Sequence, residues 1–589
     1  MSPNHSFLSF TVSVLRISNL WPTKDHHVYT KWRLFEDTSL ILSLMPCALP
    51  ILADFVLQLH GNVHNLTSLT ENIIALTCIL GMIYMTICFI QKRRLIKKLV
   101  AQLDHFTAFS DSSSLVETDR KANLYAKVFL FYGIAGNIVY MTMPYLNIDK
   151  CRYQREQNMV DLDIPCGLVT RCWFPFKFDY TPVFEIVFVH QFYTCTMVSV
   201  VILDLTMLLC GFLMHITNQL KHLRRFIVEL KFPEEKLLEK LHFCVKYHTA
   251  IITYSENTNE AFSRMMMLHL TLTSLVISAL CFEILIVDNF FDSLRFSLHL
   301  LGWLILLLLI CYYGQTLIDE SVAVAEDIYS VPWYLAPVRV QKHIYMILMR
   351  TQKPLTLNAA NMGIMAFATF LRVAIIIYWF FGNVMNCIVP LVDRSQCKLQ
   401  RKSDLYRERD PCGLMARCFY PFDVSGNLFP LAYSIQVYTC GIITYYVVVL
   451  SMTLVGLMMH VLTQLRYCRK LIRRLDKVIK EEPEDIEKTV RQIVLYHIKI
   501  IKYWDKTNEA FSTMMILHLT LTSLVISALG FEILIVDNFN DSLRFVLHLL
   551  GWLVLLLLIC FYGQILIDEV LSYTKSSSFL NFVHCRVPL

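Results

Sequence analysis

Residues 296–318 read FSLHLLGWLILLLLICYYGQTLI, and residues 545–567 read FVLHLLGWLVLLLLICFYGQILI. Neither run contains Asp, Glu, Lys or Arg. As a helix, each is long enough to cross a bilayer core of roughly 30 Å, which takes about 20 apolar residues. Because lipid cannot satisfy exposed backbone polar groups, such a run predicts a membrane-spanning helix. The two runs therefore predict an integral membrane protein.

Comparable apolar runs recur along the whole chain, which is 56% hydrophobic and only 17% charged. A soluble protein has about 25% charged residues. We expect an all-α, polytopic transmembrane bundle of about ten spans. They lie near 39–59, 72–90, 127–147, 184–214, 264–288, 296–318, 362–391, 429–460, 513–537 and 545–567. The net charge of +6 is small and spread over many loops, so nucleic-acid binding is not expected.

The distribution of Lys and Arg predicts the orientation, because these residues are retained in short cytoplasmic loops. The loop 91–125 carries seven and the loop 461–512 carries twelve. The opposite loop 59–71 carries none, and it holds Asn65 in a possible glycosylation motif, Asn-Leu-Thr. The N-terminus is therefore predicted to be cytoplasmic. Loop 392–428, predicted to be outside, carries seven and disagrees, but long loops follow the rule weakly.

A direct repeat organises the chain. Residues 259–320 and 508–569 align without gaps and differ at only eight of 62 positions. Upstream the similarity is looser, and the cysteines at 151, 166 and 172 match those at 397, 412 and 418. The two copies have the same predicted orientation, which excludes the inverted repeat of a transporter. A tandem duplication explains the pattern best.

The repeat predicts three parts of unequal completeness. Residues 1–372 form a first copy with six spans and the start of a seventh, and residues 373–569 form a partial copy corresponding to spans three to six. Residues 570–589 form an unrelated cytoplasmic tail. The apolar segment 362–391 then serves both as the seventh span of the first copy and as the third span of the second.

The linker after the sixth span carries the most specific motifs. Tyr329 precedes Trp333-Tyr334, and Arg350-Thr-Gln-Lys-Pro354 follows. Together with Leu20-Trp21-Pro22 near the start, this pattern resembles the insect odorant receptor family. The resemblance covers almost the whole chain.

The resemblance implies a receptor for volatile or otherwise small apolar molecules. In that family, the receptor assembles with a co-receptor into a tetrameric, ligand-gated cation channel. It also implies a multi-pass protein in the lipid bilayer of the plasma membrane of olfactory sensory neurons. The resemblance also implies that the seventh span lines the pore. Because segment 362–391 merges that span with the third span of the second copy, it departs from the family pattern at this helix.

Two aromatic stripes are the candidate ligand pocket. Tyr132, Gly136 and Tyr140 follow i, i+4, i+8 spacing and share one face of the third span. Phe184, Phe188 and Phe192 form a similar stripe on the fourth. An apolar pocket needs shape and a few polar groups. Ordinary aromatic packing between helices is the alternative for both stripes.

Several chemistry-bearing residues have simpler interpretations. The 19 cysteines follow no metal-binding spacing, so we expect no metal site. No enzyme motif occurs, so we expect no cofactor and no catalytic activity. Cys166 and Cys172 lie in an outer loop and could form a disulfide, with Cys151 as an alternative partner. Glu283 and Glu532 are expected to reach water near the outer boundary, and His269 and His518 to be packing residues.

Three other functions remain possible at this point. A gustatory receptor would share the fold, although its usual C-terminal signature is missing. A G-protein-coupled receptor is disfavoured by the basic loop before the third span. A fused gene product without function is the third alternative. Sequencing transcripts across residues 350–380 would test the fusion.

Overall fold

The computed structural model describes residues 7–22, 31–60, 66–149, 152–153, 166–178, 180–230, 237–286, 290–360, 363–370, 414–415, 420–422, 428–481, 486–535 and 539–584, with single residues at 373, 387 and 418. The chain divides into two compact units, Met1–Ile377 (unit 1) and Tyr378–Leu589 (unit 2). Each unit is described by itself.

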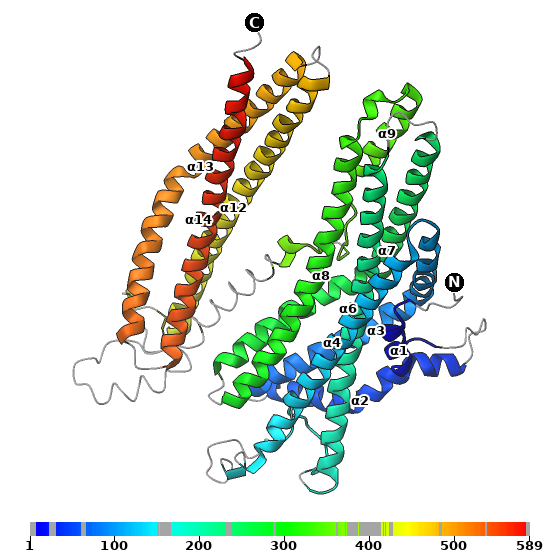
Figure 1. Ribbon diagram of the computed structural model, residues 1–589. Coiled ribbons are helices and arrows are strands. Elements are labelled where there is room, and N and C mark those ends of the chain that lie inside the picture. Colours follow the sequence, from blue (N-terminus) through cyan, green and yellow to red (C-terminus); the bar gives the residue numbers. More distant parts are fainter. Residues whose placement is uncertain are drawn as a thin grey trace. The chain divides into compact units, whose positions relative to one another are not determined.

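Long helices build both units (Figure 1). Unit 1 contains α1 (Ser9–Ile17), α2 (Lys31–His60), α3 (Leu66–Gln102), α4 (Ser112–Leu146), α6 (Val183–Val228), α7 (Leu237–Ile286), α8 (Phe290–Ser330) and α9 (Val338–Thr351). Unit 2 contains α12 (Phe429–Glu481), α13 (Ile486–Ile535) and α14 (Phe539–His584). Within the described residues, nine helices are long and apolar enough to cross a membrane. The expected all-α transmembrane bundle is confirmed; most of the predicted span 362–391 lies outside the described residues.

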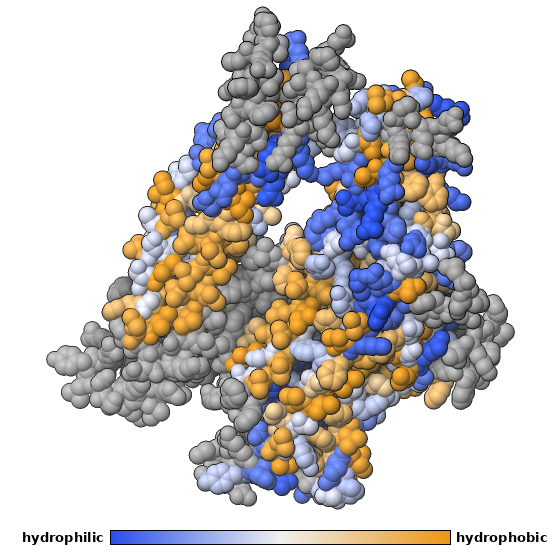
Figure 2. Space-filling view, viewed as in Figure 1, coloured by the Kyte–Doolittle hydropathy of each residue, from blue (hydrophilic) through white to orange (hydrophobic). Residues whose placement is uncertain are grey.

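Most helices extend well beyond their apolar segments. α7, for example, begins at Leu237, whereas hydropathy predicts a span beginning near residue 264. Hydropathy detects only the part that faces lipid, and the helix continues with charged residues beyond it. Figure 2 shows hydrophilic side chains gathering on unit 1 toward its α9 end, which we call the inner end, and apolar side chains over much of the rest.

α6 forms the centre of unit 1. It packs against α4, α7 and α8, and its middle turns are buried on nearly every side. α3 lies along α7, where the absence of a side chain at Gly81 makes room for Leu272. α1 docks on this bundle, since the Leu8 backbone N–H donates to Asp119 at 2.7 Å. The six long helices and α1 therefore share one continuous core.

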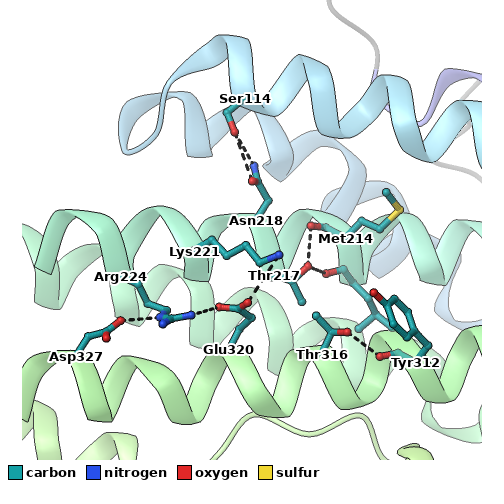
Figure 3. A network of polar contacts seen from close by, with 11 residues as sticks. Ser114, Met214, Thr217, Asn218, Lys221, Arg224, Tyr312, Thr316, Glu320 and Asp327 are labelled. Atoms are coloured by element: carbon teal, nitrogen blue, oxygen red, sulfur yellow. Dashed lines mark hydrogen bonds and ion pairs between the residues drawn. The ribbon is translucent and has the colours of Figure 1, made fainter. Parts of the chain in front are cut away.

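Polar contacts join α6 to its neighbours at the inner end (Figure 3). Arg224 lies 2.6 Å from both Glu320 and Asp327 on α8, and Lys221 lies 3.7 Å from Glu320. On the other side of α6, Asn218 donates to Ser114 of α4 at 3.1 Å. We call the contacts of Lys221, Arg224, Glu320 and Asp327 the inner ion-pair network.

The linker that follows α9 is held against α7 and α8. The backbone N–H groups of Asn358 and Ala360 donate to the side chains of Asn259 and Ser263 on α7, at 2.7 and 2.9 Å. On α8, a Cβ atom at Gly314 would lie only 2.0 Å from the carbonyl oxygen of Met365. The repeated Asn-Glu-Ala-Phe-Ser motif of the first copy therefore docks this linker, and Gly314 permits its close approach.

Unit 2 repeats the arrangement of α6, α7 and α8 with α12, α13 and α14, which pack against one another. Its described core is divided into small separate clusters, for example one around Leu454, Val455, Met458 and Ile559. Many large apolar side chains of α13 are exposed.

Candidate functional site: a cavity in unit 1

Unit 1 encloses a cavity of about 160 Å³ at the end opposite the inner ion-pair network. Its walls come from α2, α3, α4, α6 and α8, together with the loop before α6. The wall is mostly apolar, with contributions such as Ile51, Ile74, Phe129, Val198, Ile202 and Leu306. Apolar walls with a few polar groups are typical of sites for small organic ligands.

The predicted stripe on α4 contributes to this cavity. Tyr132, Gly136 and Tyr140 all line it. The Tyr132 hydroxyl donates to the Leu298 carbonyl of α8 at 3.0 Å, which fixes its ring at the wall. A Cβ atom at Gly136 would meet nothing within 4 Å. Glycine at position 136 therefore leaves open space that a larger side chain would fill.

The predicted stripe on α6 lies elsewhere. Phe184, Phe188 and Phe192 do not line the cavity, and the Phe188 ring packs 5.1 Å from the Tyr145 ring. The face of α6 that lines the cavity is instead small and polar, with Gln191, Thr194, Cys195, Val198, Ser199 and Ile202. The predicted stripe therefore stays outside this cavity, because packing against α4 and α8 decides which face of α6 turns to it.

A buried arginine forms part of the wall. Arg295 of α8 is paired with Glu71 of α3 at 2.7 Å, and both side chains are largely buried. Its guanidinium carbon lies 5.0 Å from the Tyr140 ring centre and 4.4 Å from that of Phe296. Such contacts between a cation and aromatic faces are favourable in a desolvated setting. Because Glu71 already balances the charge of Arg295, the site does not require a charged ligand.

The loop 166–178 closes over part of the cavity. Val169 and Thr170 line it, and Gln191 holds both by accepting from the Val169 N–H at 3.3 Å and donating to the Thr170 carbonyl at 3.0 Å. Arg171 is tied to the buried Asp54 of α2 at 3.0 Å. Sequence reasoning missed Asp54, although a carboxylate within an apolar span signals a function or a buried partner.

The cysteines of this loop differ from one another. Cys166 is disulfide-bonded, whereas Cys172 is a free, buried thiol. Of the two partners that the sequence left open for Cys166, Cys172 is therefore not the bonded one. Cys151, the alternative partner, lies outside the described residues, as does Asn65. Burial raises the pKa of the Cys172 thiol to about 12.

The other candidate polar residues also find places in unit 1. Glu283 is fully buried, so the expectation that it reaches water is wrong for the first copy. His269 is buried as well, with Nδ1 3.1 Å from the Thr273 hydroxyl and its ring near Trp303, which agrees with a packing role. The described residues hold no cluster of three His, Cys, Asp or Glu fit for a metal.

The chain matches the 7tm odorant receptor family twice, over residues 65–378 and 365–576. Odorant receptor 82a of Drosophila melanogaster is 22% identical over 230 residues, covering 38% of this chain and 58% of that protein. Odorant receptor 85b of the same species is 30% identical over 115 residues, covering 20% of this chain and 30% of that protein. The matched segments thus span less than two thirds of these relatives.

Solved structures of the insect olfactory receptor OR5 from Machilis hrabei share the fold. One has a TM-score of 0.52 at 17% identity and covers 64% of this chain and 96% of that chain. A second, in complex with eugenol, has a TM-score of 0.51 at 16% identity and covers 63% and 95%. The two family matches and this fold confirm the resemblance and the tandem duplication, and they place the chain among receptors, as expected for a protein that is not an enzyme.

Proposed function

Because the chain belongs to the 7tm odorant receptor family, we propose that it is an odorant-binding receptor whose ligand occupies the cavity of unit 1. The observation that carries this proposal is the open space beside Gly136, walled by apolar side chains and a few polar groups. The complex of OR5 with eugenol supports binding of a small organic molecule by this fold.

The cavity limits the size of the ligand. Its volume of about 160 Å³ is close to that of an engineered protein cavity of roughly 150 Å³ that binds benzene. Ligands with one six-membered ring or a short chain therefore fit best. Larger odorants would require the loop 166–178 or the surrounding helices to move.

The proposal extends to signalling. Following the family resemblance, the receptor acts with a co-receptor as a subunit of a tetrameric, ligand-gated cation channel, in the plasma membrane of olfactory sensory neurons and with its N-terminus in the cytoplasm. The Lys- and Arg-rich loops near the inner end support this orientation.

Filling the cavity tests the proposal. In cells that express the full chain with the co-receptor, the Gly136→Leu substitution should raise the odorant concentration for half-maximal cation current by about tenfold or more, since it occupies ligand space. Gly441→Leu is the matched control, because a Cβ atom at Gly441 of α12 also meets nothing within 4 Å but lines no part of the cavity.

Two results would contradict the proposal. Unchanged responses of Gly136→Leu would show that the ligand binds elsewhere. If the wild-type chain reaches the cell surface and no member of a broad odorant panel evokes current, the channel-subunit role fails for this fused chain.

A further inference from the structure

The polar groups without partners on the cavity wall are mainly hydrogen-bond donors. Three N–H groups of lining residues, Asn137 Nδ2, His299 Nδ1 and Arg295 Nε, have no hydrogen-bond partner within the described part of the chain. Buried polar groups normally find partners, so an unpaired set around a cavity needs an explanation.

The surroundings of Asn137 fix the direction of its amide. The amide oxygen faces α6, where it accepts from the Ser199 hydroxyl at 3.2 Å and from the Cys195 thiol at 3.5 Å. A thiol is a weak donor and a poor acceptor, so it favours the oxygen over the NH₂ group at this position. The NH₂ group of Asn137 is thereby left for another acceptor.

The tautomer of His299 follows from its neighbour. The Trp303 indole N–H lies 3.1 Å from His299 Nε2. Because an indole N–H can only donate, Nε2 must be the unprotonated nitrogen that accepts. In a neutral imidazole the proton then resides on Nδ1, which makes the unpartnered nitrogen of His299 a donor.

Three amide and carbonyl oxygens of lining residues are already engaged. The Asn137 amide oxygen accepts from α6, the Gln191 amide oxygen accepts from the Val169 N–H, and the Leu298 carbonyl accepts from Tyr132. The carboxylates nearest Arg295 are Glu71, paired at 2.7 Å, and Asp292, at 3.7 Å from Nε. The N–H groups of Asn137 and His299 therefore remain without an acceptor in the described part of the chain.

We propose that this cavity selects uncharged ligands that carry an acceptor oxygen, such as aldehydes, ketones and esters, over hydrocarbons of the same size. The inference rests on the proposed function and adds the chemical class of the ligand. A carbonyl oxygen satisfies the N–H groups of Asn137 and His299, which a hydrocarbon leaves buried and unpaired. A carboxylate gains little, because Arg295 is already neutralised by Glu71.

Three probes of equal size test the selection. Benzaldehyde carries only an acceptor, benzyl alcohol carries a donor and an acceptor, and ethylbenzene carries neither. Binding to the full chain in detergent micelles is measured from the ligand-dependent rise in the thermal unfolding midpoint. Benzaldehyde should bind at least about tenfold more tightly than ethylbenzene, with benzyl alcohol between them, because an unpaired buried donor weakens binding by at least that factor.

Substitutions locate the effect. Asn137→Leu is similar in shape and removes the donor, so it should reduce the ratio of benzaldehyde affinity to ethylbenzene affinity to about threefold or less. His299→Phe should act in the same direction. His548→Phe is the matched control, because His548 is the equivalent residue of α14 and is exposed.

The outcomes separate the two proposals. If benzaldehyde and ethylbenzene bind equally to the wild-type chain, the selection is overturned and the odorant-binding function stands. If neither binds and Gly136→Leu changes no odorant response, both proposals fail. If Asn137→Leu keeps the full preference for benzaldehyde, the NH₂ group of Asn137 does not bind the carbonyl oxygen, and this part of the proposal is overturned. Should a variant not fold, the wild-type series alone decides the selection.

Discussion

Units 1 and 2 make the same kind of contacts, in unit 1 at the inner end and in unit 2 at the corresponding end of α12, which we also call its inner end. Each pairs two basic residues of one helix with a glutamate of another, and each adds a hydrogen bond from a tyrosine to a glutamine. In unit 1 these are Lys221 and Arg224 with Glu320, and Tyr247 with Gln219; in unit 2 they are Arg466 and Arg469 with Glu569, and Tyr496 with Gln464. Three helices are thus sufficient to build this end.

Elsewhere the same side chains have different surroundings. Leu272 of α7 is 5% exposed and its equivalent Leu521 of α13 is 46% exposed; Phe282 and Phe531 are 8% and 64% exposed. In unit 2 only residues 378–428 precede α12, whereas α2, α3 and α4 precede α6 in unit 1. The cavity of unit 1 has walls from α2 and α3. Within the described residues, nearly identical sequence therefore lines this cavity only in the unit where these neighbours are present.

The largest expected difference concerns the face of α7 that meets α3. Leu272→Ala should lower the free energy of unfolding of unit 1 by about 2–5 kcal/mol, because it leaves a hole beside Gly81. Leu521→Ala should lower the free energy of unfolding of unit 2 by less than about 1 kcal/mol. Leu521 is exposed, and lipid, which is as apolar as leucine, can fill the space that the removed side chain leaves. Hydrogen exchange of α7 and α13 amides in the full chain measures both.

Equal losses in the two units would break the comparison. They would mean that another chain covers the exposed face of α13 in the assembled receptor. Leu275 and Leu524 provide an internal control, because these equivalent leucines are exposed in both units and should respond alike.

The second expected difference has opposite signs in the two units. Gly314→Ala should destabilise unit 1 by about 1–3 kcal/mol, because the new methyl group collides with the Met365 carbonyl and displaces the linker. Gly563→Ala on α14 has only Met458 near it, at 3.9 Å, and should stabilise the helix by about 0.5–1 kcal/mol. Limited proteolysis within residues 355–366 reports linker release. A linker that stays protected in Gly314→Ala would refute its docking role.

The third comparison predicts nearly equal losses of stability in the two units. Glu320→Gln and Glu569→Gln each weaken a pair of contacts to basic residues that are partly exposed. Solvent screening limits the expected loss to about 1 kcal/mol in either unit. Exchange protection of the ends of α8 and α14 should fall alike, and by less in high salt. A loss confined to one unit would show that the inner ends are held differently.

Sequence alone predicted the spans, because hydropathy reports directly on lipid exposure. It also predicted Tyr132, Gly136 and Tyr140 on one helix face, and all three line the cavity. Phe184, Phe188 and Phe192 do not line it, since packing decides which face of α6 meets the cavity. Asn137, Arg295 and His299 could not be found, because the cavity brings together single polar residues from different helices that share no motif.

The smallest effect concerns reactivity at Cys172 and its equivalent, Cys418, both free thiols in the described residues. A thiol reacts as its thiolate, and a pKa of about 12 leaves roughly one Cys172 in ten thousand ionised or fewer at pH 7.5. The thiolate fraction should rise about tenfold with each pH unit and reach one half only near pH 12. Cys418 is exposed and should be alkylated by iodoacetamide at pH 7.5 well before Cys172, as measured by mass spectrometry of the peptides.

Denaturant provides the control for this last comparison. Burial, and not the chemistry of the side chain, protects Cys172, so the two cysteines should react at similar rates once the chain is unfolded. Asp54→Ala removes the carboxylate that holds Arg171, and it should speed the labelling of Cys172 while leaving Cys418 unchanged. If Cys172 reacts as fast as Cys418 in the folded chain, the loop 166–178 is not closed over the cavity, and the burial that separates the two copies at this loop does not exist in solution.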